Sequence, residues 1–317
     1  MKTVVILGNG FDLDLGLKTS YRDFVTSHEC GKLRQGSYNN LLSIILNKFY
    51  LQNWIDLEEE LRQTAVTYSS VPLTRNRCFK SEFNDISKGL HDYLVNVQNT
   101  VGEKKLRNTS CAALLLEIMC QYPSEFEIYS FNYTDLNKLA RSLGYDGHLN
   151  LINVHGSLNS DIVLGFEDDV PGLNDFHYMI KSFNPNYSTS HVRDSLSTAK
   201  EVIIFGHSLG STDYPYFAEF FSSKSSEKLS QGHPTRISIV TYNEEAKLSI
   251  LRQLKVMNNN RTDILMDRND VTFFMTNNWM AIPQFHHLLQ RLKIEAHAKS
   301  LFLKWQNEDN LMKLSKD

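Results

Sequence analysis

Small and polar residues that could take part in catalysis follow several strand-like runs of this sequence. The pairs of run and following residues are 4–7 with Gly8-Asn9-Gly10, 126–131 with Asn132, 149–154 with His155, and 201–205 with Gly206-His207-Ser208. In a parallel sheet the carboxyl ends of the strands share one edge, and the ligand crevice lies just outside it. The sequence therefore predicts that these residues form one site.

Asn132 and His155 are the candidate catalytic residues of this site. An imidazole has an ordinary pKa of about 6.5, so His155 is suited to removing a proton near neutral pH. The amide of Asn132 can donate and accept hydrogen bonds at the same time. Each residue also has a structural interpretation, because asparagine is common in turns and caps and a buried histidine is usually hydrogen-bonded within the protein. Neither role requires a metal ion.

The opening residues 3–21 predict a buried strand, a glycine turn and the start of a helix. This layout directs backbone N–H groups at a phosphate. Gly8 and Gly10 match the first two glycines of a dinucleotide fingerprint, whereas Gly16 comes too late to be the third. Tight turns also need glycine for backbone reasons alone. Asp12 either caps the first helix or belongs to the site.

Composition narrows the class of protein. The chain has 317 residues, of which 41% are hydrophobic and 22% charged, as in globular proteins, and a formal net charge of −3 gives no general attraction to nucleic acid. We expect a cytoplasmic protein without a membrane span. The cysteines show no metal-ligand spacing, so we expect reduced thiols and no metal; they are Cys30, Cys78, Cys111 and Cys120.

The order of the elements predicts an α/β fold, a Rossmann-like parallel doubly wound sheet with a helical insertion, in a single domain over 1–317. Further strands are expected at 236–242 and 271–274, with a hairpin-like piece at 162–166. Helices are expected in the insertion, about 29–121, at 244–254, and in the tail, about 285–314. Asp56 is expected to cap a helix whose Glu58 and Glu59 form a solvated face.

A serine hydrolase is one alternative. Gly206-His207-Ser208-Leu209-Gly210 satisfies the G-x-S-x-G pattern of a nucleophile elbow, with Ser208 as the nucleophile. An acid and a histidine would have to follow it, and the candidates are Asp263 or Asp270 with His286 or His287. This alternative gives no role to Asn132 or to the first glycine turn.

Four motifs resemble the AbiH family of bacterial phage abortive-infection proteins. They are GNGFDLDLGLKTSY at 8–21, W-x-D-x-E at Trp54, Asp56 and Glu58, FNYT at 131–134, and HGS at 155–157. That family is in turn similar to the sirtuin-like NAD-binding fold. The match to W-x-D-x-E leaves room for a role of Glu58 near the site.

The resemblance implies a role for each matched residue. The cofactor phosphates would be held by Gly8, Gly10 and Asp12, and Asn9 would also bind the cofactor. The catalytic asparagine and histidine would be Asn132 and His155. The ribose and phosphate loop would consist of Gly206, Ser208 and Leu209, and the adenosine ribose would be contacted by Asn243. Thr134 stands where the sirtuin-like T-x-N-x-D motif has its aspartate, and Asp135 comes one residue later. The paired C-x-x-C zinc ligands are missing, which argues against lysine deacetylation.

The function predicted on this basis is an NAD glycohydrolase of phage defence, with NAD as its substrate. A non-catalytic nucleotide sensor that regulates a partner is the alternative from another class. A suicidal enzyme must be held inactive, so a phage-derived trigger, a partner protein or assembly into a homo-oligomer is expected to control it.

Overall fold

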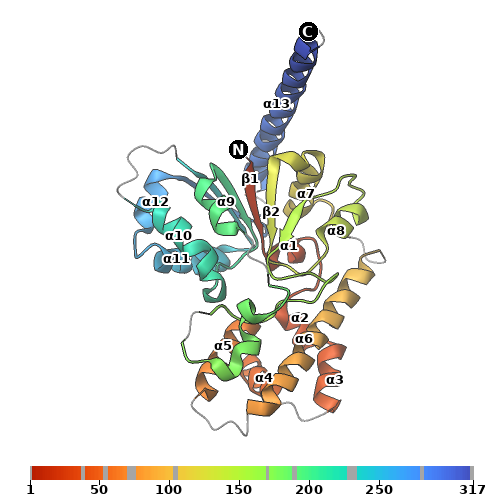
Figure 1. The fold of residues 1–317 in the computed structure, drawn as a ribbon, viewed down its shortest axis with the longest axis vertical. Helices are drawn as coiled ribbons and strands as arrows, with labels where there is room; N and C mark the ends of the chain where they lie inside the picture. Colours follow the sequence, from red (N-terminus) through yellow and green to blue (C-terminus); the bar gives the residue numbers. More distant parts are fainter. Residues whose placement is uncertain are drawn as a thin grey trace.

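A six-stranded parallel sheet forms the centre of the computed structural model (Figure 1). The structure describes residues 2–36, 40–52, 56–69, 76–102, 106–168, 171–187, 191–226, 234–278 and 282–314. The strands are β1 (Thr3–Leu7), β2 (Phe126–Ser130), β3 (Leu151–Asn153), β4 (Glu201–Phe205), β5 (Arg236–Thr241) and β6 (Asp270–Met275). Their order, β3-β2-β1-β4-β5-β6, is that of a Rossmann-like sheet, which confirms the predicted fold class.

The strands form because short β-branched and apolar runs can be buried on both faces of a parallel sheet. All five residues of β1 are buried, and β1 pairs with both β2 and β4. The run at 162–166 does not form a strand. It makes only isolated bridges, from Ile162 to Gly156 and from Phe166 to Ile180, because its apolar residues pack into a helical cluster instead.

Helices cover both faces of the sheet (Figure 1). One hydrophobic core contains Val5 and Leu7 of β1 and residues of α1 (Asn9–Asp14), α7 (Cys111–Gln121), α8 (Leu136–Ser142) and α13 (Ile282–Leu314). The other contains Val4 and Ile6 and residues of α9 (Val192–Thr198), α10 (Tyr214–Lys224), α11 (Glu244–Met257) and α12 (Thr262–Arg268). Alternate residues of β1 thus pack into the two cores on opposite faces of the sheet.

A separate layer of helices lies below the carboxyl ends of the strands (Figure 1). It consists of α2 (Tyr21–Val25), α3 (His28–Gly36), α4 (Asn40–Gln52), α5 (Leu57–Tyr68) and α6 (Asn76–Asn99), and η3 (Asn174–Met179) packs with it. The helix α7, expected in the insertion, contributes to the sheet core instead. Short 3-10 helices complete the fold: η1 (Thr100–Gly102), η2 (Pro123–Glu125), η4 (Lys181–Phe183) and η5 (Ser211–Asp213).

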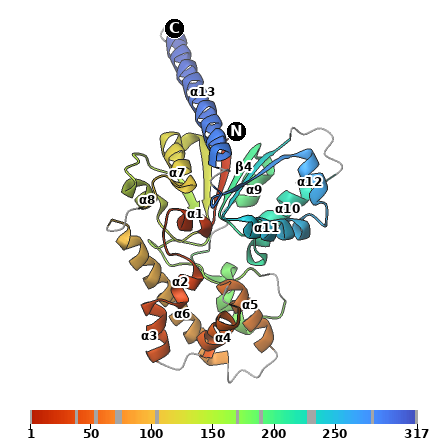
Figure 2. The same ribbon diagram turned by 180° about the vertical axis from the view of Figure 1, so that it is seen from behind.

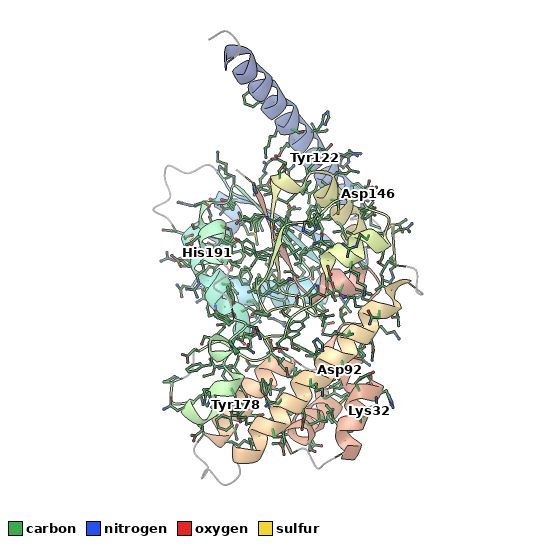
Figure 3. The ribbon with its side chains drawn as sticks, turned by 45° about the vertical axis from the view of Figure 1, so that its right-hand side comes forward. Lys32, Asp92, Tyr122, Asp146, Tyr178 and His191 are labelled. Carbon is green, nitrogen blue, oxygen red and sulfur yellow. The ribbon has the colours of Figure 1, made fainter. Side chains whose placement is uncertain are left out.

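The last helix, α13, projects from the end of the sheet opposite the helical layer (Figure 2). It is one helix of 33 residues. Figure 3 labels a side chain at each of these two ends of the sheet: Tyr178 lies in the helical layer, and Tyr122 lies beside α13. None of the described helices is both long enough and apolar enough to cross a membrane.

The N-terminal caps of α5 and α1 show which of two acidic residues, Asp56 and Asp12, caps a helix. Asp56 caps α5, as predicted, because its side chain accepts a hydrogen bond from the backbone N–H of Glu59. Gly8 is the N-cap of α1 and offers no side chain, so Asp12 is not the cap of that helix. Asp12 is therefore available to the site.

Candidate functional site

A cavity of about 410 Å³ lies at the carboxyl ends of β1, β2 and β4, where the sheet meets the helical layer. This is where the strand order reverses, the usual place for a ligand in a doubly wound sheet. The structure brings most of the predicted residues together there. Those that line the cavity are Gly8, Asn9, Asp12, Asn132, His155, Gly206 and Ser208.

The other predicted residues are not among those that line the cavity. Gly10 packs against the turn after β4, with its N–H donating to the carbonyl oxygen of Gly206. Leu209 is buried. Asn243 caps α11 by accepting a hydrogen bond from the N–H of Ala246. Trp54 lies outside the described residues.

The glycines allow two turns to touch. A Cβ on Gly8 would lie 2.5 Å from the Cα of His207, and one on Gly206 would lie 2.4 Å from the backbone nitrogen of Phe11. Gly206 also has a φ of +65°, in the left-handed region that favours glycine. The close approach of the β1–α1 and β4 turns fixes one side of the cavity.

Asp12 links the turn after β1 to the residues after β2. Its Oδ1 accepts from Nδ2 of Asn132 at 3.0 Å, and its Oδ2 accepts from Oγ1 of Thr134 at 2.8 Å. Burial raises the pKa of Asp12 to about 7, although both hydrogen bonds oppose the rise. Threonine suits position 134, because a second carboxylate there would repel Asp12.

Asn132 is held rigidly by this network. Its Nδ2 also donates to the carbonyl oxygen of Gly8 at 3.0 Å, so both amide protons are used within the protein. Its Oδ1 is left to accept a hydrogen bond from a ligand hydroxyl or a water molecule.

His155 follows β3 and is 3% exposed. Its Nε2 lies 3.1 Å from Nζ of Lys181 and 3.3 Å from Oδ1 of Asp213. Burial, together with the positive charge of Lys181, lowers the pKa of His155 to about 4. The imidazole is therefore neutral at neutral pH, which corrects the expectation of an ordinary histidine pKa.

Lys181 lies at the centre of the buried charges and is 0% exposed. Its Nζ lies 3.0 Å from Oε2 of Glu58, 3.1 Å from Nε2 of His155 and 3.2 Å from Oδ1 of Asp213. Burial lowers the pKa of Lys181, but the negative charges of Asp213 and Glu58 outweigh that effect and raise it. Lys181 is thus a buried ammonium ion with three partners.

Two carboxylates share this ammonium. Burial and the nearby Asp213 and Asp56 raise the pKa of Glu58 to about 8. Burial would also raise the pKa of Asp213, but Lys181 and His155 outweigh it and hold that pKa well below its usual range. Lys181 and His155 thus favour the ionised form of Asp213, whereas burial favours the acid form of Glu58.

His207 supports Asp213 from the other side. Its Nδ1 accepts from the backbone N–H of Leu209 at 3.0 Å, so the proton of a neutral His207 is assigned to Nε2. That Nε2 lies 3.3 Å from Oδ2 of Asp213. Both carboxylate oxygens of Asp213 are therefore occupied.

Glu58, His155 and Asp213 are close enough to share a metal ion, since one ligand atom from each lies within 4.8 Å of the others. Nζ of Lys181 lies 3.0 to 3.2 Å from an atom of each of these residues. The ammonium occupies the position that a metal ion would need. The set of Glu58, His155 and Asp213 therefore does not fit a metal ion while Lys181 is in place.

The geometry of the described residues does not support the serine hydrolase alternative. Ser208 lines the cavity, but Asp263, Asp270, His286 and His287 are not among the residues that do so. Ser208 also lies before η5 rather than at a direct turn from β4 into a helix. A nucleophile elbow requires that direct turn.

Sequence reasoning missed Lys181 and Asp213 as site residues, placed His207 at the site only as part of the turn after the run 201–205, and expected Glu58 on a solvated face. Glu58 is instead 6% exposed. The W-x-D-x-E motif was the signal for Glu58. Lys181 carries no such signal, because it lies in a polar stretch and its partner Glu58 is 123 positions away.

The family model for bacteriophage abortive infection AbiH matches residues 4–231, which is most of the chain. The chain belongs to the AbiH family. Membership of this family gives the protein a function in bacteriophage abortive infection. The matched range includes each residue of the Glu58, His155, Lys181 and Asp213 cluster. No curated protein and no solved structure matches the chain.

Proposed function

We propose that this AbiH protein is an NAD glycohydrolase that cleaves the nicotinamide–ribose bond and depletes NAD in infected cells. One observation carries the proposal: Asn132 and His155 line one cavity together with two buried acids, Asp12 and Glu58. The pKa values of these acids are raised to about 7 and about 8. Groups that exchange protons near neutral pH are typical of acid–base sites.

The cavity suits a nucleotide in size and position. Its volume of about 410 Å³ falls within the range of small-molecule sites. Gly8 and Asn9 of the β1–α1 turn line it, and a sirtuin-like fold would hold the phosphates at this turn. We therefore treat NAD as the substrate and the sirtuin-like similarity as part of the proposal.

The residues fit cleavage of a glycosidic bond to a pyridinium. This bond breaks through an oxocarbenium-like state, and nicotinamide leaves as a neutral molecule that needs no proton. A negative charge on Asp12 would stabilise the positive charge that develops on the ribose. Oδ1 of Asn132 and the neutral imidazole of His155 would orient a ribose hydroxyl and the attacking water.

The test is NAD turnover by the purified protein beside His155→Ala and Asn132→Ala, with nicotinamide and ADP-ribose as the products measured. We expect each variant to lose roughly 100-fold in rate, the order of loss when the reacting groups are no longer held in position. Asp263→Asn is the control, because Asp263 is exposed on α12 and does not line the cavity.

Three other results would replace the proposal. Tight NAD or ADP-ribose binding without products, even in phage-infected extract, indicates a sensor. Esterase activity that Ser208→Ala abolishes indicates a serine hydrolase. The absence of nucleotide binding contradicts both the enzyme and the sensor.

Control of the activity belongs to the same proposal. An enzyme that depletes NAD must be inactive before infection, so we propose that a phage-derived trigger, a partner protein or assembly of copies of the chain activates it. NAD turnover measured with and without extract from infected cells tests for the trigger.

A further inference from the structure

Glu58 has one carboxylate oxygen that the protein leaves unused. Its Oε2 accepts from Lys181, whereas Oε1 is buried and has no hydrogen-bond partner among the described residues. Glu58 lines the cavity from the first turn of α5. An unpaired buried oxygen is costly and is therefore a sign of function when it lines a cavity.

The remaining acid–base groups of the cluster are unsuited to accepting a proton from water. Both oxygens of Asp213 are engaged, by Lys181 and by His207. Nε2 of His155 lies 3.1 Å from the Lys181 ammonium and 3.3 Å from Oδ1 of Asp213, and burial and the ammonium outweigh the carboxylate, so a proton on Nε2 is disfavoured. Glu58 is the member of the cluster with a free oxygen.

We propose that Glu58 is the general base of the cavity and that Lys181 is the positioning residue that fixes its carboxylate. This inference rests on the proposed glycohydrolase and deepens it. The bond from the water oxygen to C1′ of the ribose forms as the bond from C1′ to the nicotinamide nitrogen breaks. The bonding electron pair leaves with nicotinamide, and Oε1 of Glu58 takes the proton of the water. That proton then passes to solvent, so hydrolysis releases ADP-ribose, nicotinamide and one proton.

Charged and titratable groups from several elements surround Glu58 and set its proton affinity. They are Asp56 at the start of α5, Tyr21 of α2, Tyr133 after β2, His155 after β3, Lys181 of η4 and Asp213 of η5. Two of them are carboxylates and one is a cation. Because the carboxylates and burial favour the protonated acid, the turnover rate is expected to rise with pH until Glu58 is ionised.

The first test is Glu58→Gln, which keeps an oxygen for Lys181 and removes the base. We expect NAD binding to persist and turnover to fall roughly 100-fold or more. Glu59→Gln is the matched control, because Glu59 is the next residue of α5 but does not line the cavity. Glu58→Ala with added formate is a second variant, in which a small carboxylate in the vacated space restores part of the rate.

An infrared titration of the protein without ligand gives an independent readout. Glu58 in its acid form has a carboxylic C=O band that disappears as the pH rises. Burial also raises the pKa of Asp12, which therefore adds a carboxylic band of its own, so the titration is done in Asp12→Asn. The Glu58 band is expected in this variant and is expected to be missing once Glu58→Gln is added to it.

The outcomes separate the two proposals. An active wild type with an equally active Glu58→Gln overturns the role of Glu58 and leaves the glycohydrolase standing. An inactive wild type overturns the glycohydrolase, and the infrared titration then decides whether Glu58 carries the exchangeable proton. A spectrum that Glu58→Gln leaves unchanged overturns the inference in either case.

Discussion

Nζ of Lys181 lies 3.0 Å from Oε2 of Glu58, and this ion pair joins two layers of the molecule. Glu58 belongs to α5 of the helical layer, whereas the other partners of Lys181, His155 and Asp213, follow strands of the sheet. One buried ammonium therefore holds the helical layer against the carboxyl ends of the strands. The cavity lies at this junction.

Replacing Lys181 with methionine should destabilise the protein strongly. The change removes the cation but leaves two buried acids, and breaking such a buried pair costs about 3–5 kcal/mol. The free energy of unfolding from urea denaturation measures the loss. Lys255→Met is the control, because Lys255 is exposed on α11 and its replacement should change stability by less than about 0.5 kcal/mol. Equal stability of the two variants would contradict the structural role of Lys181.

Asp12 should make the protein less stable as the pH rises. Its pKa is about 7 in the folded protein against 3.8 for the free side chain, so the folded state binds more protons between these values. Stability then falls by up to about 1.4 kcal/mol per pH unit. Asp12→Asn keeps groups for Asn132 and Thr134 but does not titrate. The stability of the wild type relative to this variant should fall from about pH 4 to about pH 7 and then level off.

His155 should have the opposite effect over a lower range. Its pKa falls from 6.5 to about 4 on folding, so the unfolded state binds more protons between these values. Stability relative to His155→Gln should therefore rise from about pH 4 to about pH 6.5, by up to about 3 kcal/mol. Urea denaturation of both proteins across this range gives the difference. A difference that is independent of pH would mean that His155 is not buried in its neutral form.

The sheet and the place of the site could be predicted because they depend on local patterns. The run at 201–205 is β4 with the predicted bounds, and the turns after β1, β2, β3 and β4 meet at one edge. A parallel sheet brings strand ends together whatever lies between the strands. Asn132 and His155 could therefore be placed in one cavity from their positions after strands.

The buried charges could not be predicted, because their neighbours are distant in the sequence. Glu58 and Glu59 look alike in the sequence. Glu58 is buried and contacts Lys181, which is 123 positions away, whereas Glu59 pairs with Arg62 on the same helix. The run at 162–166 has the pattern of a strand, but the helical cluster offers its apolar residues another place to pack. Long-range packing decides both cases.

The contact between the turns after β1 and β4 should tolerate no side chain at position 206. Gly206→Ala introduces two costs, a positive φ and a Cβ only 2.4 Å from the nitrogen of Phe11. Gly144→Ala introduces only the first, because Gly144 has a φ of +80° but a Cβ there would meet no atom within 4 Å. A positive φ alone costs about 1–2 kcal/mol, so Gly144→Ala should lose about that much stability and Gly206→Ala clearly more. Urea denaturation compares the two variants, and NAD turnover should fall in Gly206→Ala alone, since the turn that it displaces carries Ser208 and His207. Equal losses of stability would show that the two turns can move apart without consequence for the site.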